Sequence, residues 1–289
     1  MAALDRATLG VIGGSGLYDL DTLSDVRTVR IETPFGDPSD ELLLGTLHGI
    51  RIAFLPRHGR GHRILPSELN FRANIHAMKQ LGVQQLLAVG AVGSLREEIA
   101  PGQVITPDQF IDRTFARSAT FFGGGVVAHV QFGDPVCEKL RGAVGAAAQA
   151  AGAKVHPSGV YVCMEGPHFS TRAESNLYRS WDASVIGMTN LQEAKLAREA
   201  EMCFATLALC TDYDCWHEEE EEVAVASIVA VVQANARLAS QTIVELAASR
   251  LPTGDCACHH ALDGAIFTDR ATIPAGARER LQVIAGKYL

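Results

Sequence analysis

The sequence predicts an α/β fold, a single domain with a central mixed β-sheet flanked by helices. Apolar runs of strand length alternate along the chain with segments whose apolar residues recur at three- and four-residue spacing. The 289 residues are 47% hydrophobic and 20% charged, which is enough apolar side chain for one large core. Gly and Pro mark the junctions without forming a long linker. We therefore expect one domain over residues 1–252 and a C-terminal tail of uncertain structure over 253–289.

The expected elements follow in chain order. Strands are predicted for eight apolar runs: TLGVIGG, ELLLGTL, RIAFLP, QQLLAVGAVGS, GQVITPDQF, GVYVCMEG, ASVIGM and CFATLALCTDY. Helical spacing predicts helices over 67–81, 136–151, 171–181, 190–200 and 223–249. Beyond the last helix the periodicity weakens, and only a peripheral tail is expected there.

Charge and composition exclude several classes of function. The chain has 33 acidic against 25 basic residues and no basic stripe, so nucleic acid is not an expected partner. No apolar run approaches the roughly 18 residues that a membrane helix needs, and the start MAALDRATLGVIGG is not typical of a signal peptide. The seven cysteines lie mostly in apolar segments. These features predict a soluble cytoplasmic protein with reduced cysteines and no membrane partner.

A glycine-rich turn, GVIGGSGLYDL, follows the first predicted strand. Gly14 and Gly16 match the first two glycines of the dinucleotide fingerprint, but Asp19 stands where the third glycine is required. No Lys-Ser or Lys-Thr pair completes a P-loop. Ser15 is not in a G-x-S-x-G nucleophile elbow either. Two interpretations stay open: a plain tight turn, and a turn whose backbone N–H groups and Ser15 hydroxyl hold phosphate.

Two further turns follow strands. LPRHGRGH concentrates basic side chains from Arg57 onward, and a guanidinium fork with a neighbouring His58 suits a phosphate, although a solvated basic turn is the alternative. GAVGSLREEIAPG offers the Ala91 N–H to the same anion. Three such turns after three strands are typical of the site-forming edge of an open α/β sheet.

Carboxylates and cysteines supply the remaining candidates. In LCTDYDCW, Asp212 and Asp214 follow an apolar strand, where they form either a polar loop or a functional pair. The acidic run HEEEEEVAV is interpreted as a solvated helix start. CACHH at 256–260 has metal-ligating residue types but no second ligand pair, so we expect an ordinary tail and no metal site, with zinc or a redox-sensitive pair as alternatives.

Taken together, the chain resembles the trimeric purine nucleoside phosphorylases. The matching segments run in the family's order from residue 9 to about 248: VIGGSGLYD, TPFGDPSD, RHGRGH, PSELNFRANIHAMKQLG, GSLREEIAPG, DQFIDRT, EGPHFSTRAES and GMTNLQEAKLAREAEMCFATLALCTDYDCW. The resemblance implies a distorted mixed sheet, a homotrimer and no metal or organic cofactor. It implies a pentosyltransferase of purine and methionine salvage, in which phosphate attacks the anomeric carbon of methylthioadenosine to give adenine and 5-methylthioribose 1-phosphate.

The resemblance also implies roles for individual residues. Phosphate would be held by Ser15, Arg57, His58, Ala91 and Thr189. Met188 would lie under the ribose, and Phe169 and Ser170 would meet the base. Asp212 would bond the purine N7, with Asp214 beside the amino group. Val225, Ile228 and Val229 would wall the methylthio pocket, and His129 would reach into the site of a neighbouring subunit.

Two points stay open at this level. Where the family usually has a hydroxyl or amide residue before the Ala-Val-Gly-Ser turn, this chain has Gly90, so one contact to phosphate or ribose is lost or supplied by water. A 6-oxopurine would set an acceptor against the aspartates, which favours adenine. A phosphorylase for methylthioinosine or other purine nucleosides, a non-catalytic nucleotide sensor and, more remotely, a nicotinamide dehydrogenase remain alternatives.

Overall fold

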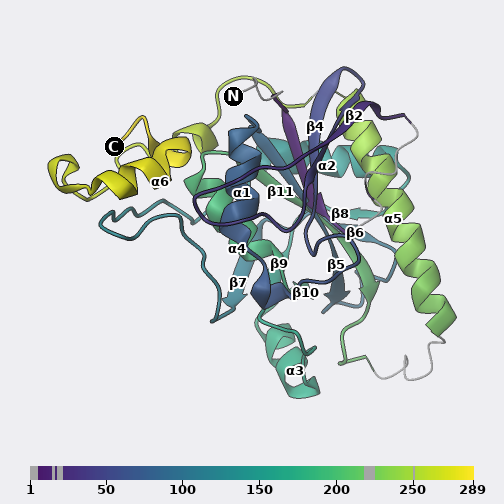
Figure 1. The fold of residues 1–289 in the computed structure, drawn as a ribbon. Helices are drawn as coiled ribbons and strands as arrows, with labels where there is room; N and C mark the ends of the chain where they lie inside the picture. Colours follow the sequence, from purple (N-terminus) through teal and green to yellow (C-terminus); the bar gives the residue numbers. More distant parts are fainter. Residues whose placement is uncertain (1–5, 15–16, 18–21, 218–224, 250) are drawn as a thin grey trace.

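The computed structural model describes residues 6–14, 17, 22–217, 225–249 and 251–289, with only the backbone of 225–230. It confirms the α/β class: a mixed, eleven-stranded sheet lies between two groups of helices (Figure 1). The strands are β1 Leu9–Gly13, β2 Ser24–Val29, β3 Leu42–Leu47, β4 Ile50–Pro56, β5 Gln85–Ser94, β6 Val104–Ile105, β7 Gln109–Arg113, β8 Val155–His156, β9 Val160–Met164, β10 Val185–Gly187 and β11 Cys203–Asp212. Their main path runs β2-β3-β4-β1-β5-β10-β9-β7, and β11 continues from β5 to β6 and β8.

Helices cover both faces of the sheet. The helical segments are η1 Pro66–Glu68, α1 Phe71–Gln80, α2 Glu138–Ala150, α3 Arg172–Ser180, α4 Asn190–Glu199, α5 Val225–Ala248, η3 Ala257–His260, η4 Arg270–Thr272 and α6 Ala275–Ala285. Helices α1, α4 and α6 pack together on one face, while α2 and α5 pack on each other and on β11 on the opposite face (Figure 1). Each face has its own buried apolar cluster.

The parallel strands β1, β4, β5 and β11 form the centre of the sheet. β1 is buried at every position and β11 at its first eight. Such continuous apolar runs are typical of parallel strands that are covered on both faces. Because the four strands run the same way, the turns that follow them emerge at one edge of the sheet.

The structure corrects the predicted limits of one helix and one strand, and it adds two strands that the sequence did not predict. The helix expected over 67–81 begins at Phe71, because Asn70 caps it by accepting a hydrogen bond from the Ala73 N–H at 3.2 Å. The strand expected over 102–110 is divided into β6 and β7 around Pro107, which has no N–H for a ladder. Strands β2 and β8 were missed because β2 is almost wholly exposed and β8 has two residues.

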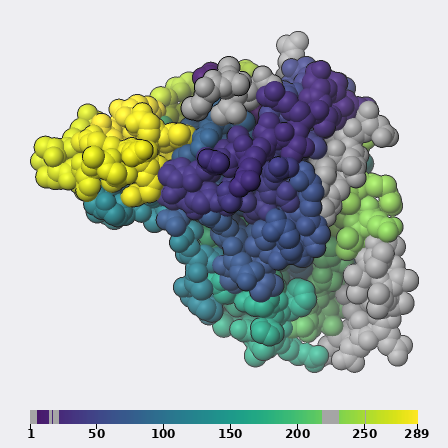
Figure 2. Space-filling view, in the orientation of Figure 1, coloured from purple at the N-terminus to yellow at the C-terminus, as the bar shows by residue number. Residues whose placement is uncertain are grey.

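Residues 253–289, for which the sequence predicts only a peripheral tail, have defined structure. The segment forms η3, η4 and α6, and the side chains of Leu281 and Ile284 are buried in the cluster beneath α1 and α4. In the space-filling view it is the yellow lobe at the side of the body (Figure 2). Among the helices that the structure describes, none is long and apolar enough to cross a membrane.

Candidate active site

The carboxyl edge of the central strands carries most of the predicted site residues. Arg57 and His58 directly follow β4, and Asp212 ends β11. The edge of β5 that faces away from β11 pairs with β1 up to Ala88 and with antiparallel β10 from Gly93. In the part of the chain that the structure describes, the four residues between them pair with no strand on that side. The sheet is therefore open along this stretch of β5, between β1 and β10.

The unpaired stretch of β5 is exposed at its middle. Gly90 is half-buried and Ala91 exposed, although the preceding residues of the strand are buried. Among the described residues, only the Arg57 Nη1, at 3.8 Å, would lie within 4 Å of a Cβ placed on Gly90. The described residues thus leave the space over Gly90 open, and this space borders the guanidinium.

Arg57 is buried, with 3% of its surface exposed, and is already largely occupied. Its Nε and Nη2 donate to the Glu193 carboxylate at 2.5 and 2.9 Å, its Nη1 donates to the Val89 carbonyl at 2.8 Å, and its Nη2 donates to the Ile12 carbonyl at 3.2 Å. The predicted bidentate fork toward phosphate is therefore wrong, since Glu193 occupies it. One Nη1–H of the five N–H groups is left for an anion.

Glu193 lies on α4 and was not predicted as a site residue. Glu193 is fully buried. The only signal for it in the sequence is an acidic residue in the first turn of the predicted helix NLQEAKLARE. Burial opposes the charged form of Arg57, but the Glu193 carboxylate outweighs burial and raises the pKa of Arg57. The two contacts of 2.5 and 2.9 Å between the guanidinium and the carboxylate have the geometry of an ion pair, and such a pair contributes little net positive charge to the opening.

His58 has a defined proton arrangement. Its Nδ1 lies 2.8 Å from the Ile64 carbonyl, which can only accept, so this nitrogen carries the proton. Burial lowers the pKa of His58 to about 4, and the ring stacks on His62 with centroids 4.3 Å apart. At neutral pH its Nε2 is consequently an acceptor. In this form His58 differs from the donor that the sequence predicts, and its Nε2 suits the hydroxyl of a protonated phosphate.

Thr189 and Met188 join β10 to α4. Thr189 is the N-cap residue of α4, yet its side chain makes no capping hydrogen bond. A helix N-terminus with a spare hydroxyl is suited to an anion. Met188 touches the loop after β9, because a Cβ on Gly166 would lie 2.6 Å from the Met188 sulfur.

Asp212 and Asp214 flank a glycine of β5. A Cβ on Gly93 would lie 3.1 Å from the Asp212 Oδ1 and 3.3 Å from the Asp214 Cβ. The Asp212 Oδ2 accepts a hydrogen bond from the Thr211 hydroxyl at 2.6 Å. The Asp214 Oδ2 is buried, and no hydrogen-bond partner for it lies among the described residues. Gly93 thus makes room for two carboxyl groups at the end of β5.

Aromatic residues hold the Asp214 turn. Trp216 is buried, and its Nε1 donates to the Ser94 carbonyl at 2.8 Å, which fixes the turn to the end of β5. The Tyr213 hydroxyl donates to the Glu97 carbonyl at 3.1 Å, and its ring stacks on His217 with centroids 4.6 Å apart. These positioning contacts were missed, although DYDCWH shows the aromatic residues.

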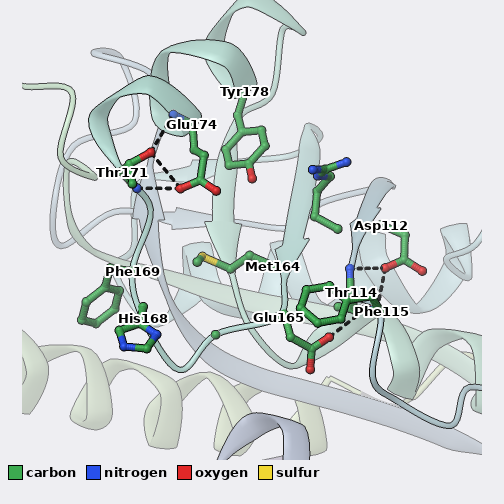
Figure 3. A pocket seen from close by; sticks show the side chains of 12 residues that line it. Asp112, Thr114, Phe115, Met164, Glu165, His168, Phe169, Thr171, Glu174 and Tyr178 are labelled. Atoms are coloured by element: carbon green, nitrogen blue, oxygen red, sulfur yellow. Dashed lines mark hydrogen bonds between the residues drawn. The ribbon is translucent and has the colours of Figure 1, made fainter.

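Phe169 lies on the rim of a cavity of about 420 Å³ at the carboxyl ends of β7 and β9 (Figure 3). Phe115 and Glu165 line its opposite side in the same view. Phe169 is 83% exposed, so its ring is free to cover a ligand. Ser170 lies near the aspartate turn, because the Cys215 thiol donates to its carbonyl at 3.2 Å. Arg57 and Asp212 do not line this cavity, whose walls are Asp112, Arg113, Thr114, Phe115, Met164, Glu165, Gly166, His168, Phe169, Thr171, Glu174 and Tyr178.

Arg117 links this cavity to the strand edge and was also missed. Its Nε donates to Glu165 at 3.0 Å, and its two Nη groups bond the carbonyls of Met164, Glu165 and Met188. Its side chain is 1% exposed. A buried guanidinium with that many carbonyl partners fixes the loop after β9 against Met188.

Of the other predicted site residues, the structure describes the side chain of His129 alone. Ser15 lies outside the described residues, as do the side chains of Val225, Ile228 and Val229, whose backbone forms the start of α5. His129 is exposed and packs edge-on against Phe267, with ring centroids 5.2 Å apart. Its backbone N–H donates to the Ala265 carbonyl at 2.9 Å. His129 is therefore held by the C-terminal segment, away from the strand edge of its own chain.

Comparisons with known proteins show the family to which the chain belongs. Residues 8–248 match the family described as the phosphorylase superfamily. The S-methyl-5'-thioadenosine phosphorylase of Geobacter sulfurreducens is 59% identical over 283 residues, which cover 97% of this chain and 99% of that protein. The protein of the same description from Koribacter versatilis is 57% identical, over 98% of this chain and 97% of its own length.

Solved structures show the same fold. A methylthioadenosine phosphorylase from an antarctic soil metagenomic library has a TM-score of 0.93 and 46% identity, covering 97% of this chain and 99% of that one. A mutant adenosine/methylthioadenosine phosphorylase from Schistosoma mansoni, in complex with methylthioadenosine, has a TM-score of 0.79 and 34% identity over 84% of this chain and 92% of its own. The resemblance found in the sequence is confirmed, and the chain belongs to the phosphorylase superfamily.

Proposed function

We propose that the chain catalyses phosphorolysis of S-methyl-5'-thioadenosine, giving adenine and 5-methylthioribose 1-phosphate. The observation that carries the proposal is the position of the Asp212 and Asp214 carboxyl groups around Gly93, on the same edge as the opening beside Arg57. One end of this edge suits an anion and the other suits the edge of a purine. The relatives named for methylthioadenosine support the choice of substrate.

At the anion end, phosphate would lie over Gly90. The remaining Arg57 Nη1–H, the Ala91 N–H, the Thr189 hydroxyl and the N-terminus of α4 supply donors. The neutral His58 accepts from a phosphate hydroxyl, which leaves the other oxygens free to attack. The attacking oxygen forms a bond to the anomeric carbon as the bond to N9 breaks, so no protein nucleophile and no organic cofactor are needed.

At the base end, the electron pair of the broken bond moves into the purine. A protonated Asp212 donates to N7 and neutralises the leaving base. The Thr211 hydroxyl has two acceptors within reach, the Asp212 Oδ2 at 2.6 Å and the Val92 carbonyl at 3.3 Å. While the Thr211 hydroxyl donates to Oδ2, the acid carries its single proton on Oδ1, from which it is donated to N7. Asp214 accepts from the 6-amino group.

The remaining substrate contacts extend the proposal. Met188 lies under the ribose, while Phe169 and Ser170 cover the base. Val225, Ile228 and Val229 form the methylthio pocket, where an apolar wall favours thiomethyl over hydroxyl by about ten- to two-hundredfold. Adenosine is then a poor substrate.

The enzyme works as a cytoplasmic homotrimer in this proposal, and His129 completes the site of an adjacent subunit. The exposed His129, Phe267 (70% exposed) and Val127 (50% exposed) form an apolar patch that supports an interface. Active protein that sediments with the mass of one chain would contradict this part of the proposal.

Release of free base, measured with and without phosphate, tests the reaction. We expect adenine from methylthioadenosine only when phosphate is present, and a much lower specificity constant for methylthioinosine. Equal constants for the two substrates would contradict adenine specificity. Binding of methylthioadenosine with no release of base in phosphate would instead identify a nucleotide sensor.

A further inference from the structure

The C-terminal segment brings two cysteines to two cysteines of the core. Cys256 and Cys258 meet Cys137 and Cys203, and the four sulfur atoms all lie within 4.8 Å of one another. The Cys137 and Cys256 sulfurs are 3.8 Å apart. The second ligand pair that CACHH lacks in the sequence is thus supplied by the fold, from residues more than 50 positions away in the chain.

Three parts of the fold hold the four cysteines. Cys137 is the N-cap residue of α2 and Cys203 is the first residue of β11, while Cys256 and Cys258 lie at the start of and within η3. Cys137, Cys203 and Cys258 are buried and Cys256 is half-buried. The cluster is therefore enclosed, with one side open to an entering ion.

We propose that these four cysteines bind a structural zinc ion. Zinc in Cys₄ sites is tetrahedral with Zn–S bonds of about 2.3 Å, which sets the sulfur atoms about 3.8 Å apart. The distance between the Cys137 and Cys256 sulfur atoms already has this value. The other sulfur pairs need to approach by no more than about 1 Å to reach it. Four thiolates fill the coordination sphere, so the site is of the closed, structural kind.

The surroundings stabilise thiolate. Cys137 is the N-cap residue of α2, and the N-terminus of that helix favours negative charge on the Cys137 sulfur. The Lys139 ammonium donates to the Asp255 carbonyl at 3.1 Å, which puts a cation beside the Cys256 segment. The His259 Nε2 lies 3.6 Å from the Cys203 sulfur, as an outer partner.

Such an ion would fasten the C-terminal segment to the core. Cys203 starts β11 and Asp212 ends it, so the cluster lies about 30 Å from the aspartates along a strand that rises about 3.3 Å per residue. The inferred role is thermal stability of residues 253–289, with no part in phosphorolysis.

Metal content of the purified full chain, kept reduced, is the direct test. We expect one zinc per chain by mass spectrometry of the metals. The double variant Cys256→Ser/Cys258→Ser should lose it, while the control Cys210→Ser, a buried cysteine outside the cluster, should keep it. Zinc retained by the double variant, or none in the parent chain, overturns the proposal.

Cobalt exchange and intact mass address the parent chain itself, so the test does not depend on how the variants fold. Cobalt should give the visible bands of a tetrahedral site with strong thiolate charge transfer, and a chelator should lower the melting temperature by several degrees. Zinc binding and disulfides exclude each other here. An intact mass lower by two hydrogens for each of two cysteine pairs, in protein made without added oxidant, would overturn the zinc site in favour of disulfides.

Discussion

The Arg57 guanidinium and the Glu193 carboxylate form a buried pair, with Nε–Oε1 at 2.5 Å and Nη2–Oε2 at 2.9 Å. Glu193→Gln removes the compensating charge but keeps an acceptor. Removing one partner of a buried ion pair destabilises a protein by about 3–5 kcal/mol, and we expect the stability of Glu193→Gln to fall by an amount near the lower end of that range. Arg57 is then uncompensated, so phosphate should bind more tightly.

Melting temperatures with and without phosphate measure both effects. The phosphate-dependent rise should be larger in Glu193→Gln than in the parent chain. Glu199→Gln is the matched control, because Glu199 lies on the same helix and accepts from Thr120 and Phe121 without touching Arg57. An equal phosphate response in all three proteins would show that the pair does not govern the anion site.

A serine at Gly90 tests the open space beside Arg57. Its Cβ has no neighbour closer than 3.8 Å, so Gly90→Ser should fold normally. The new hydroxyl can donate to phosphate, and a net hydrogen bond of about 0.5–1.5 kcal/mol corresponds to a roughly two- to tenfold lower KM for phosphate. Gly93→Ser is the contrast, because its Cβ crowds Asp212 and Asp214 and should raise the KM for nucleoside. An unchanged phosphate KM in Gly90→Ser would place the anion elsewhere.

Asp212→Asn tests the acid at N7. The amide keeps the size of the side chain but cannot transfer a proton, so kcat/KM for methylthioadenosine should fall by about 10²–10⁴. Activity on methylthioinosine should be retained or rise, because the amide can bridge N7 and a 6-oxo group. The phosphate contacts are untouched, so the KM for phosphate should change little. A mutant as active as the parent would make Asp212 an ordinary loop carboxylate.

Arg117→Lys tests whether the loop after β9 positions the substrate. Lysine keeps the charge but cannot replace the fork that bonds Glu165 and the Met188 carbonyl. We expect the KM for methylthioadenosine to rise about ten- to hundredfold, with a smaller change in the KM for phosphate. Steady-state kinetics with each substrate varied in turn measure the two KM values separately. Equal rises in both constants would indicate general loosening of the fold.

His76→Phe tests the acid sensitivity of the fold. Burial lowers the pKa of His76 to about 4, against about 6.5 in an unfolded chain. As the pH falls, the unfolded state therefore binds a proton before the folded state does. The contribution of the neutral, buried His76 to stability is complete above pH 6.5 and is lost as the pH falls from 6.5 to 4. His58 acts in the same window. Phenylalanine keeps the ring contacts with Phe35 and Phe121, and it removes an Nε2 for which the described residues supply no partner. It also removes the Nδ1, which lies 3.0 Å from the Gln80 Nε2.

Melting curves between pH 7 and 4.5 give the readout. The variant should lose stability less steeply on acidification than the parent chain, while His48→Asn, at an exposed turn, should follow the parent. Identical slopes in His76→Phe and the parent would exclude this histidine as a cause of acid sensitivity.

The sequence by itself determined the buried central strands, the turns that follow them and the residues at their carboxyl ends. This was possible because strand periodicity, glycine turns and paired carboxylates are local signals. Arg57, Asp212 and Asp214 were recognisable for the same reason.

Only the tertiary structure decided what those residues contact. Glu193 is 136 positions from Arg57, and Cys137 is 119 positions from Cys256. The sequence predicted a free guanidinium fork and an ordinary tail. In the fold, a buried carboxylate binds the guanidinium, and two cysteines of the core lie against the two cysteines of the tail. Such pairs depend on which strands and helices become neighbours, and that is set by packing of the whole core and leaves no trace in local spacing.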